Sequence, residues 1–339
     1  MKNKKNNRKI AIAVIIIILL VLTFIFYKKE VNNTNLKEIT IRLKYFHQSQ
    51  FSGVYVAQEN GYFKERGLKV NIEQYIPEES SMDALINGKV DIIITSTYEL
   101  IKAREKGLPV KAFGVKYQKN PISLYSLKNM NINIPYDLVG KKVGIEKSYD
   151  IERAYMSLIK KLNINRSLIK EVQIGWEGKE ILNRTVDVAT GYFMNEPYYL
   201  IKEGEEVNII LLEDWGIIDY SDILVVREET IKNNPEIPEN FLKAVIKGWK
   251  YSIKNQKDSV KTTLKYSKHL GRNEDNELYM LQNTAELMLF KDAPILWMEK
   301  QRWEEIYNRL LENGEITKPF NIEEAYTMEF LNKVYGKNN

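Results

Sequence analysis

Short apolar strands alternate with amphipathic helices along the chain from residue 38 onward. Ile39, Ile41 and Leu43 alternate with polar residues, which is the two-residue period of a half-buried strand. The run 91–94 is almost wholly apolar, as a strand buried in a parallel sheet is. The same reasoning predicts strands over 39–43, 68–72, 91–94 and 110–115, and helices over 54–60, around 82–86 and over 98–106. This strand–helix order predicts an α/β sheet covered by helices on both faces.

A second α/β unit follows a break rich in Asn and Pro at 129–135. Its predicted strands are 142–145, 172–175, 186–189 and 207–212, and its predicted helices are 151–162, 177–183 and 198–203. The apolar run 223–226 leads back out of this unit, and the pattern after residue 228 is almost all helical. Two α/β units joined by two extended crossings, near 122–127 and 223–226, predict a hinged protein with two lobes.

The predicted domain organisation follows from these boundaries. We expect lobe 1 to begin with residues 38–127, lobe 2 to be inserted as residues 128–224, and residues 225–339 to return to lobe 1 as C-terminal helices. Residues 28–37 are expected to be a polar linker, and residues 1–9 a basic cytoplasmic segment. A length of 339 residues exceeds what one core of typical size needs, which agrees with two lobes.

An uninterrupted apolar run occupies residues 10–27, with Thr23 as its one mildly polar member. A helix of that length spans roughly 27 Å, close to the thickness of a bilayer core. Five basic residues precede the run and two follow it, so the start is expected to stay cytoplasmic and the rest to be exported. We expect a transmembrane anchor. The alternatives are a cleaved signal peptide, which usually has a shorter apolar region and a small-residue cleavage site, and a buried core helix.

Composition excludes several classes of function. The chain has no cysteine, so disulfides, thiolate metal sites, a cysteine nucleophile and a lipid-modified cysteine are ruled out. His47 and His269 are the two histidines, which makes a multi-histidine metal site improbable. The net charge of +5 comes from the seven basic residues in 1–29; the rest has 43 basic and 45 acidic residues, a net −2. A nucleic-acid-binding surface is therefore not indicated.

The chain carries no recognised catalytic signature. It lacks a GxSxG elbow, a GxxxxGK[ST] phosphate loop, a GxGxxG turn and an HExxH helix. Paired carboxylates brought together by folding remain compatible with the sequence. No cofactor is expected.

Three stretches resemble solute-binding proteins related to the thiamine-pyrimidine synthases. They are 53–70 (GVYVAQENGYFKERGLKV), 84–91 (ALINGKVD) and 137–144 (DLVGKKVG). The resemblance continues through 195–197 (NEP), 215–222 (WGIIDYSD) and 248–251 (GWKY), and covers roughly residues 39–335. The second group of stretches is similar to the branch that binds pyrimidines and flavins. Members of the wider group bind thiamine precursors, riboflavin, sulfonates or nitrate.

The resemblance implies a type II periplasmic-binding-protein fold, whose ligand lies beyond the carboxyl ends of the strands where both lobes reach it. We therefore expect ligand contacts from side chains that follow strand ends. In lobe 1 these are Phe46, Phe51, Tyr55, Ser96, Thr97, Tyr98, Tyr117, Gln118 and Asn120; in lobe 2 they are Ser148, Tyr149, Asp150, Tyr192, Asn195, Glu196, Trp215 and Tyr220. Each has a simpler alternative: core packing for the aromatic residues, N-capping for the serines, and a solvated helix start for Glu196.

Two departures argue against synthase activity. In the synthases that the chain resembles, a histidine stands just before the first helix, and the corresponding position here is Phe51. Their cysteine-rich motif is also missing, since the chain has no cysteine. His47 is expected to be an ordinary loop residue.

The expected function is that of a membrane-tethered, monomeric solute-binding protein on the extracytoplasmic face. It would capture a small flat heteroaromatic metabolite, such as a thiamine pyrimidine precursor or a riboflavin-like compound, and deliver it to an ABC permease. An asparagine–glutamate pair at a strand end suits a ring with an exocyclic amine. The alternatives are a sulfonate- or nitrate-binding protein, which needs Arg or Lys in the cleft, a sensory ligand-binding module, and a pyrimidine-precursor synthase.

Overall fold

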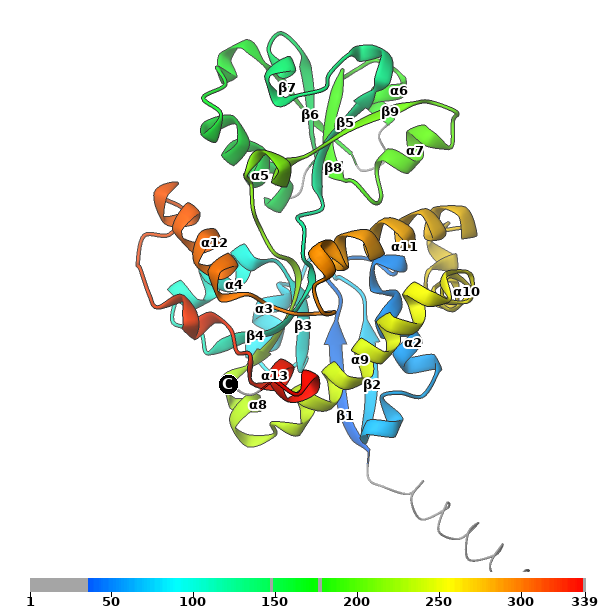
Figure 1. The fold of residues 1–339 in the computed structure, drawn as a ribbon, viewed down its shortest axis with the longest axis vertical. Coiled ribbons are helices and arrows are strands. Elements are labelled where there is room, and N and C mark those ends of the chain that lie inside the picture. The colour runs from blue at the N-terminus through cyan, green and yellow to red at the C-terminus, as the bar shows by residue number, and fades with distance from the viewer. Residues whose placement is uncertain (1–35, 147–148, 176–178, 338–339) are drawn as a thin grey trace, which may run out of the picture. The chain divides into compact units, whose positions relative to one another are not determined.

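Two five-stranded mixed sheets organise residues 38–339 in the computed structural model, which describes residues 36–146, 149–175 and 179–337 (Figure 1). The first sheet has the order β2 (Leu68–Glu73), β1 (Lys37–Arg42), β3 (Ile92–Thr95), β10 (Ser221–Arg227) and β4 (Val110–Tyr117). The second has the order β7 (Lys170–Ile174), β6 (Lys142–Glu146), β8 (Val188–Tyr192), β5 (Ile122–Leu127) and β9 (Val207–Leu211). The prediction of a mixed α/β protein is confirmed. We call the elements around the two sheets lobe 1 and lobe 2.

Each sheet contains one strand that runs against its neighbours. In lobe 1, β1 and β3 are parallel, whereas β10 is antiparallel to β3 and β4. In lobe 2, β6 is parallel to β7 and β8, whereas β5 is antiparallel to β8 and β9. The antiparallel strands β5 and β10 are those that directly follow the two crossings between the lobes. The chain therefore enters lobe 2 through 118–121 and returns through the segment before β10.

The first crossing differs from the sequence expectation. Residues 122–127 were expected to end lobe 1, but they form β5 and pair with β8 and β9 in lobe 2. The local pattern contains only an apolar run, and such a run fits either sheet. Its place is decided by pairing with strands that lie more than sixty residues away.

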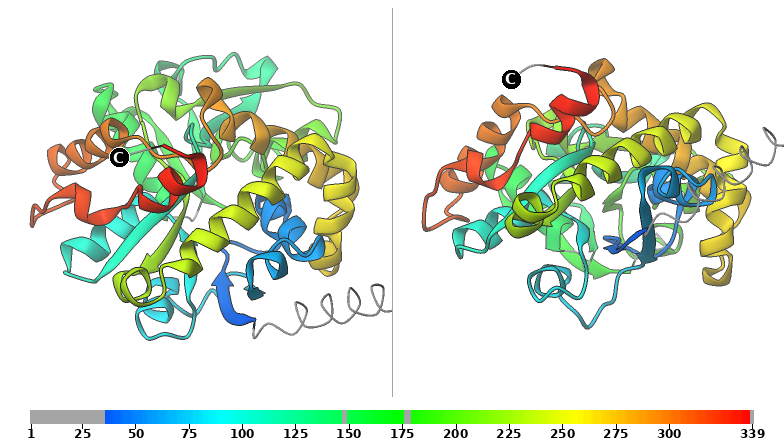
Figure 2. Two further views of the ribbon diagram at one scale, coloured as in Figure 1. Left: turned by 60° about the horizontal axis from the view of Figure 1, so that its bottom comes forward. Right: turned by 90° about the horizontal axis from the view of Figure 1, so that it is seen from below.

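Nine helices described in lobe 1 cover its sheet. They are α2 (Ser52–Glu59), α3 (Ser81–Ile86), α4 (Thr97–Glu105), α8 (Glu228–Asn233), α9 (Glu236–Lys254), α10 (Gln256–Ser267), α11 (Glu274–Met288), α12 (Lys300–Glu312) and α13 (Glu329–Tyr335). The C-terminal helices share one apolar core with β1, β3 and β4, and α9 and α10 lie beside α2 (Figure 2). Lobe 2 carries α5 (Tyr149–Lys161), α6 (Lys179–Leu182) and α7 (Pro197–Ile201).

A close crossing of α2 and α9 explains two glycines of the motifs quoted above. A Cβ atom on Gly53 would lie 2.4 Å from the indole ring of Trp249, and one on Gly248 would lie 2.0 Å from the carbonyl oxygen of Gly53. Both distances are well below van der Waals contact. Glycine at 53 and 248 therefore lets the two helices approach and holds α2 against the sheet.

The predicted anchor at 10–27 lies outside the described residues. No helix in the part of the chain that the structure describes is long and apolar enough to cross a membrane.

Candidate ligand-binding site

A cavity of about 450 Å³ lies at the carboxyl ends of β1, β2 and β3 from lobe 1 and of β6 and β8 from lobe 2. Lobe 1 lines it with Lys44, Tyr45, Gln48, Gln50, Tyr75, Pro77, Glu78, Glu79, Ser80, Ser81, Ile94, Thr95 and Glu99. Lobe 2 lines it with Glu146, Asp150, Ile151, Tyr192, Asn195 and Glu196. This is the position in which open α/β sheets bind ligands, and the volume suits a small molecule.

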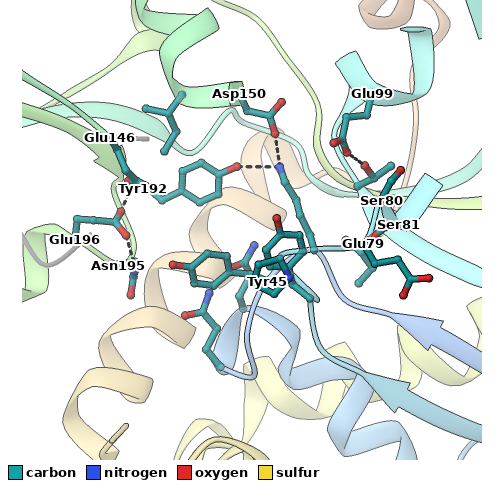
Figure 3. Close-up of a pocket in the computed structure, with 18 of the residues that line it drawn as sticks. Tyr45, Glu79, Ser80, Ser81, Glu99, Glu146, Asp150, Tyr192, Asn195 and Glu196 are labelled. Carbon is teal, nitrogen blue, oxygen red and sulfur yellow. Dashed lines mark hydrogen bonds and ion pairs between the residues drawn. The ribbon is translucent and has the colours of Figure 1, made fainter. Parts of the chain in front are cut away.

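Lys44 connects the two lobes inside this cavity. It lies two residues after the end of β1, and its Nζ lies 2.8 Å from Asp150 Oδ2 and donates to the Tyr192 hydroxyl at 3.0 Å. Figure 3 shows Asp150 and Tyr192 directed at the same amino group. Burial lowers the pKa of Lys44, but the charges of Asp150, Tyr192 and Asp222 and the hydrogen bond to Asp150 together outweigh it and hold the pKa well above its usual range. Both partners are therefore charged.

The segment after β8 folds back so that Glu196 points at the strand end. Its carboxylate accepts hydrogen bonds from the backbone N–H of Tyr192 at 2.5 Å and from the Asn195 side chain. Gly191 leaves the room that this needs, since a Cβ there would lie 2.9 Å from Glu196 Oε2. Burial raises the pKa of Glu196 to about 7, although the hydrogen bonds from Asn195 and Tyr192 oppose the rise.

Glu146 is a second buried carboxyl on the same wall, at the end of β6 (Figure 3). Its side chain is 6% exposed, and its Oε2 has no hydrogen-bond partner among the described residues. Burial, and then the charge of Glu196, raises the pKa of Glu146 well above its usual range. Glu146 is not among the contact residues predicted from the sequence, although an acidic residue at the end of an apolar strand is a visible signal.

Three acidic residues, Glu78, Glu79 and Glu99, line the lobe 1 side. Glu79, before α3, pairs with Arg42 at 3.0 Å. Glu99 lies in the first turn of α4 and accepts from the Thr95 hydroxyl. Glu99 is exposed in the cleft, yet its pKa is raised. The first cause is the surrounding protein, which removes water from around the carboxylate, and the second is the negative charge of Asp150. Together these groups give the cavity a strongly acidic lining.

The aromatic wall comes from Tyr45 and Tyr75, which line the cavity on the lobe 1 side. Phe46 lies between them, edge-on to the Tyr45 ring at 5.2 Å and to the Tyr75 ring at 6.2 Å, but does not itself line the cavity. A planar ligand stacks favourably on such side chains. Within the loop 45–52, which the sequence places beside the first helix, Phe46 is the individual residue predicted to contact a ligand, whereas Tyr45 of the same loop and Tyr75 line the cavity. Position after a strand does not fix which side chain faces inward.

Of the predicted contact residues, Asp150, Tyr192, Asn195 and Glu196 line the cavity. The other described candidates have different partners. Phe51, Tyr55 and Tyr117 lie in the lobe 1 core, where Tyr55 stacks on Tyr266 and the Tyr117 hydroxyl contacts Thr284. Core packing, the simpler alternative for these aromatic residues, describes their surroundings. Their predicted contact with a ligand stays a prediction.

Several predicted residues shape the connections instead of lining the cavity. Ser96 caps α4 by accepting from the backbone of Glu99, and Thr97 donates to the carbonyl of Tyr220 at 2.6 Å. Asn120 lies in the crossing and donates to the carbonyl of Ile217 at 3.1 Å, which ties the two crossings together. Tyr220 is buried and its hydroxyl accepts from the backbone of Glu299.

Five further candidates complete the set. Gln118 is buried and donates to the carbonyl of Trp297 at 2.7 Å, and Trp215 packs on the lobe 2 core beside Tyr136. Tyr98 faces the guanidinium of Arg153. Tyr149 is the first residue of α5, but its side chain, like the whole of Ser148, lies outside what the structure describes.

Buried charges support the lobe 1 loop beneath the cavity. Lys116 pairs with Asp222 and donates to the carbonyl of Gln50 at 2.7 Å, and the Gln50 amide donates to Asp222 at 2.7 Å. This network fixes the position of Gln50, which lines the cavity. Within the described ranges, no three His, Asp or Glu side chains come together in a way that would hold a metal ion.

Comparisons with known proteins agree with this architecture. Residues 48–259 match the family described as NMT1/THI5 like. The chain is 25% identical to the riboflavin-binding protein RibY of Chloroflexus aurantiacus over 87% of this chain and 86% of that protein. It is 23% identical to the formylaminopyrimidine-binding protein of Halalkalibacterium halodurans over 86% of this chain and 90% of that protein.

An enzyme and a solved structure are also similar. The 4-amino-5-hydroxymethyl-2-methylpyrimidine phosphate synthase of Legionella pneumophila is 24% identical, over 86% of this chain and 92% of the enzyme. The periplasmic aliphatic sulphonate binding protein SsuA of Escherichia coli superposes with a TM-score of 0.67 at 15% identity, over 85% of this chain and 91% of that one. The last likeness shows a shared periplasmic-binding-protein fold. With its family match extending over more than half of its length, the chain belongs to the NMT1/THI5-like family.

Proposed function

We propose that this protein is the solute-binding component of an ABC importer and that it binds a small flat heteroaromatic metabolite between its two lobes. The observation that carries the proposal is the cavity at the strand ends of both sheets, which combines aromatic walls with buried hydrogen-bonding groups. Such a combination is typical of small-molecule sites. The fold is that of type II periplasmic-binding proteins, in which the lobes close on the ligand like a hinge.

The proposed class of ligand, a flat heteroaromatic ring, rests on the side chains of the two opposite walls of the cavity. Tyr45 and Tyr75 offer faces for stacking, and Glu196 with Asn195 offers in-plane acceptors and a donor. A pyrimidine or flavin ring presents a π face and in-plane N–H groups together, which this arrangement satisfies. The names of the riboflavin- and formylaminopyrimidine-binding relatives support the same class.

Closure is proposed to be a shift between open and closed populations. Lys44 in lobe 1 already contacts Asp150 and Tyr192 in lobe 2, so the closed arrangement has contacts of its own. A ligand that touches both walls adds contacts that only the closed form makes, and so favours it. The permease is proposed to recognise that form.

We also propose a location at the outer face of the cell membrane, as a monomer held by residues 10–27 as an uncleaved anchor. The proposal rests on the length of the apolar run and on the basic residues before it. Mass spectrometry of the exported protein tests it. Peptides that include residues 1–9 support the anchor, and a mature N-terminus after residue 27 contradicts it.

Binding without catalysis is the proposed activity, despite the similarity to a synthase. The chain has Phe51 where the synthases that it resembles have a histidine, and it has no cysteine. Incubation of the protein with pyridoxal phosphate distinguishes the two functions, because a Schiff-base absorbance would support the enzyme.

A thermal-shift panel tests the proposed function. It compares riboflavin, thiamine, 4-amino-5-hydroxymethyl-2-methylpyrimidine and an alkyl sulfonate, because a ligand that binds only the folded state raises its stability. We expect a concentration-dependent rise in Tm for one of the ring compounds. A rise for the sulfonate alone would reject the heteroaromatic assignment.

A further inference from the structure

The charges that line the cavity are unequal. Among residues 36–146, 149–175 and 179–337, six carboxyl side chains line it, against one ammonium group from Lys44. The six are Glu78, Glu79, Glu99, Glu146, Asp150 and Glu196. The soluble part of the chain is nearly neutral as a whole, so the excess of acid is a local property of this cavity.

The basic side chains near the cavity are already paired. Lys44 Nζ lies 2.8 Å from Asp150. Arg42 bridges Glu73 and Glu79, at 3.1 and 3.0 Å. Arg272, which reaches Asn195 from lobe 1, holds its main ion pair with Glu277 at 2.7 Å. To find a counter-charge among these three described side chains, an anionic ligand would have to break one of their ion pairs.

Two of the acidic groups lie deep in the wall with unused hydrogen-bonding capacity. Glu146 is 6% exposed and its Oε2 has no hydrogen-bond partner within the part of the chain that the structure describes, and Glu196 is 4% exposed. A buried carboxyl oxygen without a partner is unfavourable, and N–H groups from a ligand relieve that cost. Burial raises the pKa of both carboxyls, and the charge of Glu196 adds to the rise at Glu146; a cation beside them would favour their charged forms.

We propose that the cavity selects a positively charged planar nitrogen base, whose N–H groups meet Glu146 and Glu196, and that it rejects anionic ligands such as phosphorylated or sulfonated compounds. Glu146 is thereby assigned as a specificity-determining residue. The inference rests on the proposed function as a small-molecule binder and adds the charge of the ligand to it. It separates this site from the sulfonate-binding alternative, whose anionic ligand needs a free cation in the cleft.

Three probes with one ring and different charges test the inference. Benzamidinium, benzamide and benzoate are cationic, neutral and anionic at neutral pH, and each is titrated calorimetrically into the full-length protein. Since a charge-assisted hydrogen bond contributes more than a neutral one, we expect benzamidinium to bind about 10-fold or more tighter than benzamide. We expect no binding of benzoate. Equal affinities, tighter binding of benzoate, or no binding of benzamidinium at millimolar concentration would overturn the inference.

Two variants of cavity residues test whether the cavity wall causes the preference for benzamidinium. Glu146→Gln should weaken benzamidinium binding about 10-fold while changing benzamide by about twofold or less. Glu99→Gln, at a position exposed in the cleft, is a second variant with the same expected direction. Glu206→Gln is the matched control, because that side chain is 76% exposed on the surface of lobe 2 and should leave all three titrations unchanged. An unchanged benzamidinium affinity in Glu146→Gln would remove the assigned role of Glu146, whatever Glu99→Gln does.

The outcome is separable from that of the proposed function. If benzamidinium binds as expected but no ring compound of the thermal-shift panel does, the charge selectivity stands and the ring class is wrong. If a ring compound binds and benzoate matches benzamidinium, the proposed function stands and the charge selectivity is wrong.

Discussion

Replacing Glu196 by glutamine should stabilise the folded protein increasingly as the pH rises. Burial raises the pKa of Glu196 to about 7 from an ordinary value of 4.5. In the unfolded chain this carboxyl ionises near its ordinary value, so between the two values the folded state binds more protons than the unfolded state. The wild-type protein therefore loses stability as the pH rises from about 4.5 to about 7, and Glu196→Gln does not suffer this loss.

The magnitude follows from the shift. Each pKa unit corresponds to about 1.4 kcal/mol, so the difference in unfolding free energy between variant and wild type should grow by about 3 kcal/mol from pH 4 to pH 8. Glu196 is 4% exposed, so solvent does little to reduce the effect. Removing its charge also removes one cause of the raised pKa of Glu146, which acts in the same direction.

Urea unfolding of both proteins across this pH range measures the difference. The hydrogen bonds to Tyr192 and Asn195 that the variant loses change the difference in unfolding free energy by the same amount at every pH. The way this difference varies with pH reports the titration of the Glu196 carboxyl. Glu206→Gln, at an exposed position, should give a flat difference. A flat difference for Glu196→Gln as well would refute the reasoning and place its carboxyl in an ordinary environment.

Three further variants test other parts of the structure. Lys44→Met removes the contacts of Lys44 with Asp150 and Tyr192 and should lower the free energy of unfolding by about 1–3 kcal/mol. Small-angle scattering should show a larger radius of gyration. An unchanged radius would show that Lys44 does not hold the lobes together. Gly248→Ala should destabilise the protein by about 3 kcal/mol in urea unfolding, because the new Cβ would lie 2.0 Å from the Gly53 carbonyl oxygen. Gly175→Ala is the control and should be tolerated, since the nearest atom to its Cβ would be 3.7 Å away. Tyr45→Ala should weaken binding of a ring ligand by about 1 kcal/mol beyond the lost contact area, while Tyr45→Phe keeps most of the affinity; equal affinities for all three proteins in calorimetry would place the ring elsewhere.

The sequence predicts the alternation of strands and helices well because burial in a sheet imposes a local pattern. The strand expected over 91–94 is β3 at Ile92–Thr95, and the one expected over 142–145 is β6 at Lys142–Glu146. The side of the crossing on which residues 122–127 lie depends on long-range pairing with β8 and β9, which no local pattern contains.

The candidate site is predicted in part for a similar reason. Position at a strand end selects the right neighbourhood, and Tyr192, Asn195 and Glu196 do line the cavity. It does not determine side-chain direction, so Phe51 and Tyr117, chosen by the same rule, lie in the core of lobe 1. Lys44 and Glu146 were missed because charged residues at strand ends are common on protein surfaces. What distinguishes them is their surroundings in the fold: Lys44 contacts Asp150 and Tyr192 of lobe 2, and Glu146 is 6% exposed.

Calorimetric titration with a ring compound and an anion tests the central claim most directly. Riboflavin, 4-amino-5-hydroxymethyl-2-methylpyrimidine and an aliphatic sulfonate are each titrated into the wild-type protein and into Glu196→Gln. The account predicts one-to-one binding of one of the two ring compounds, an affinity about 10- to 100-fold weaker in Glu196→Gln, and no binding of the sulfonate. Binding of the sulfonate alone, or ring binding that is unaffected by Glu196→Gln, would contradict it.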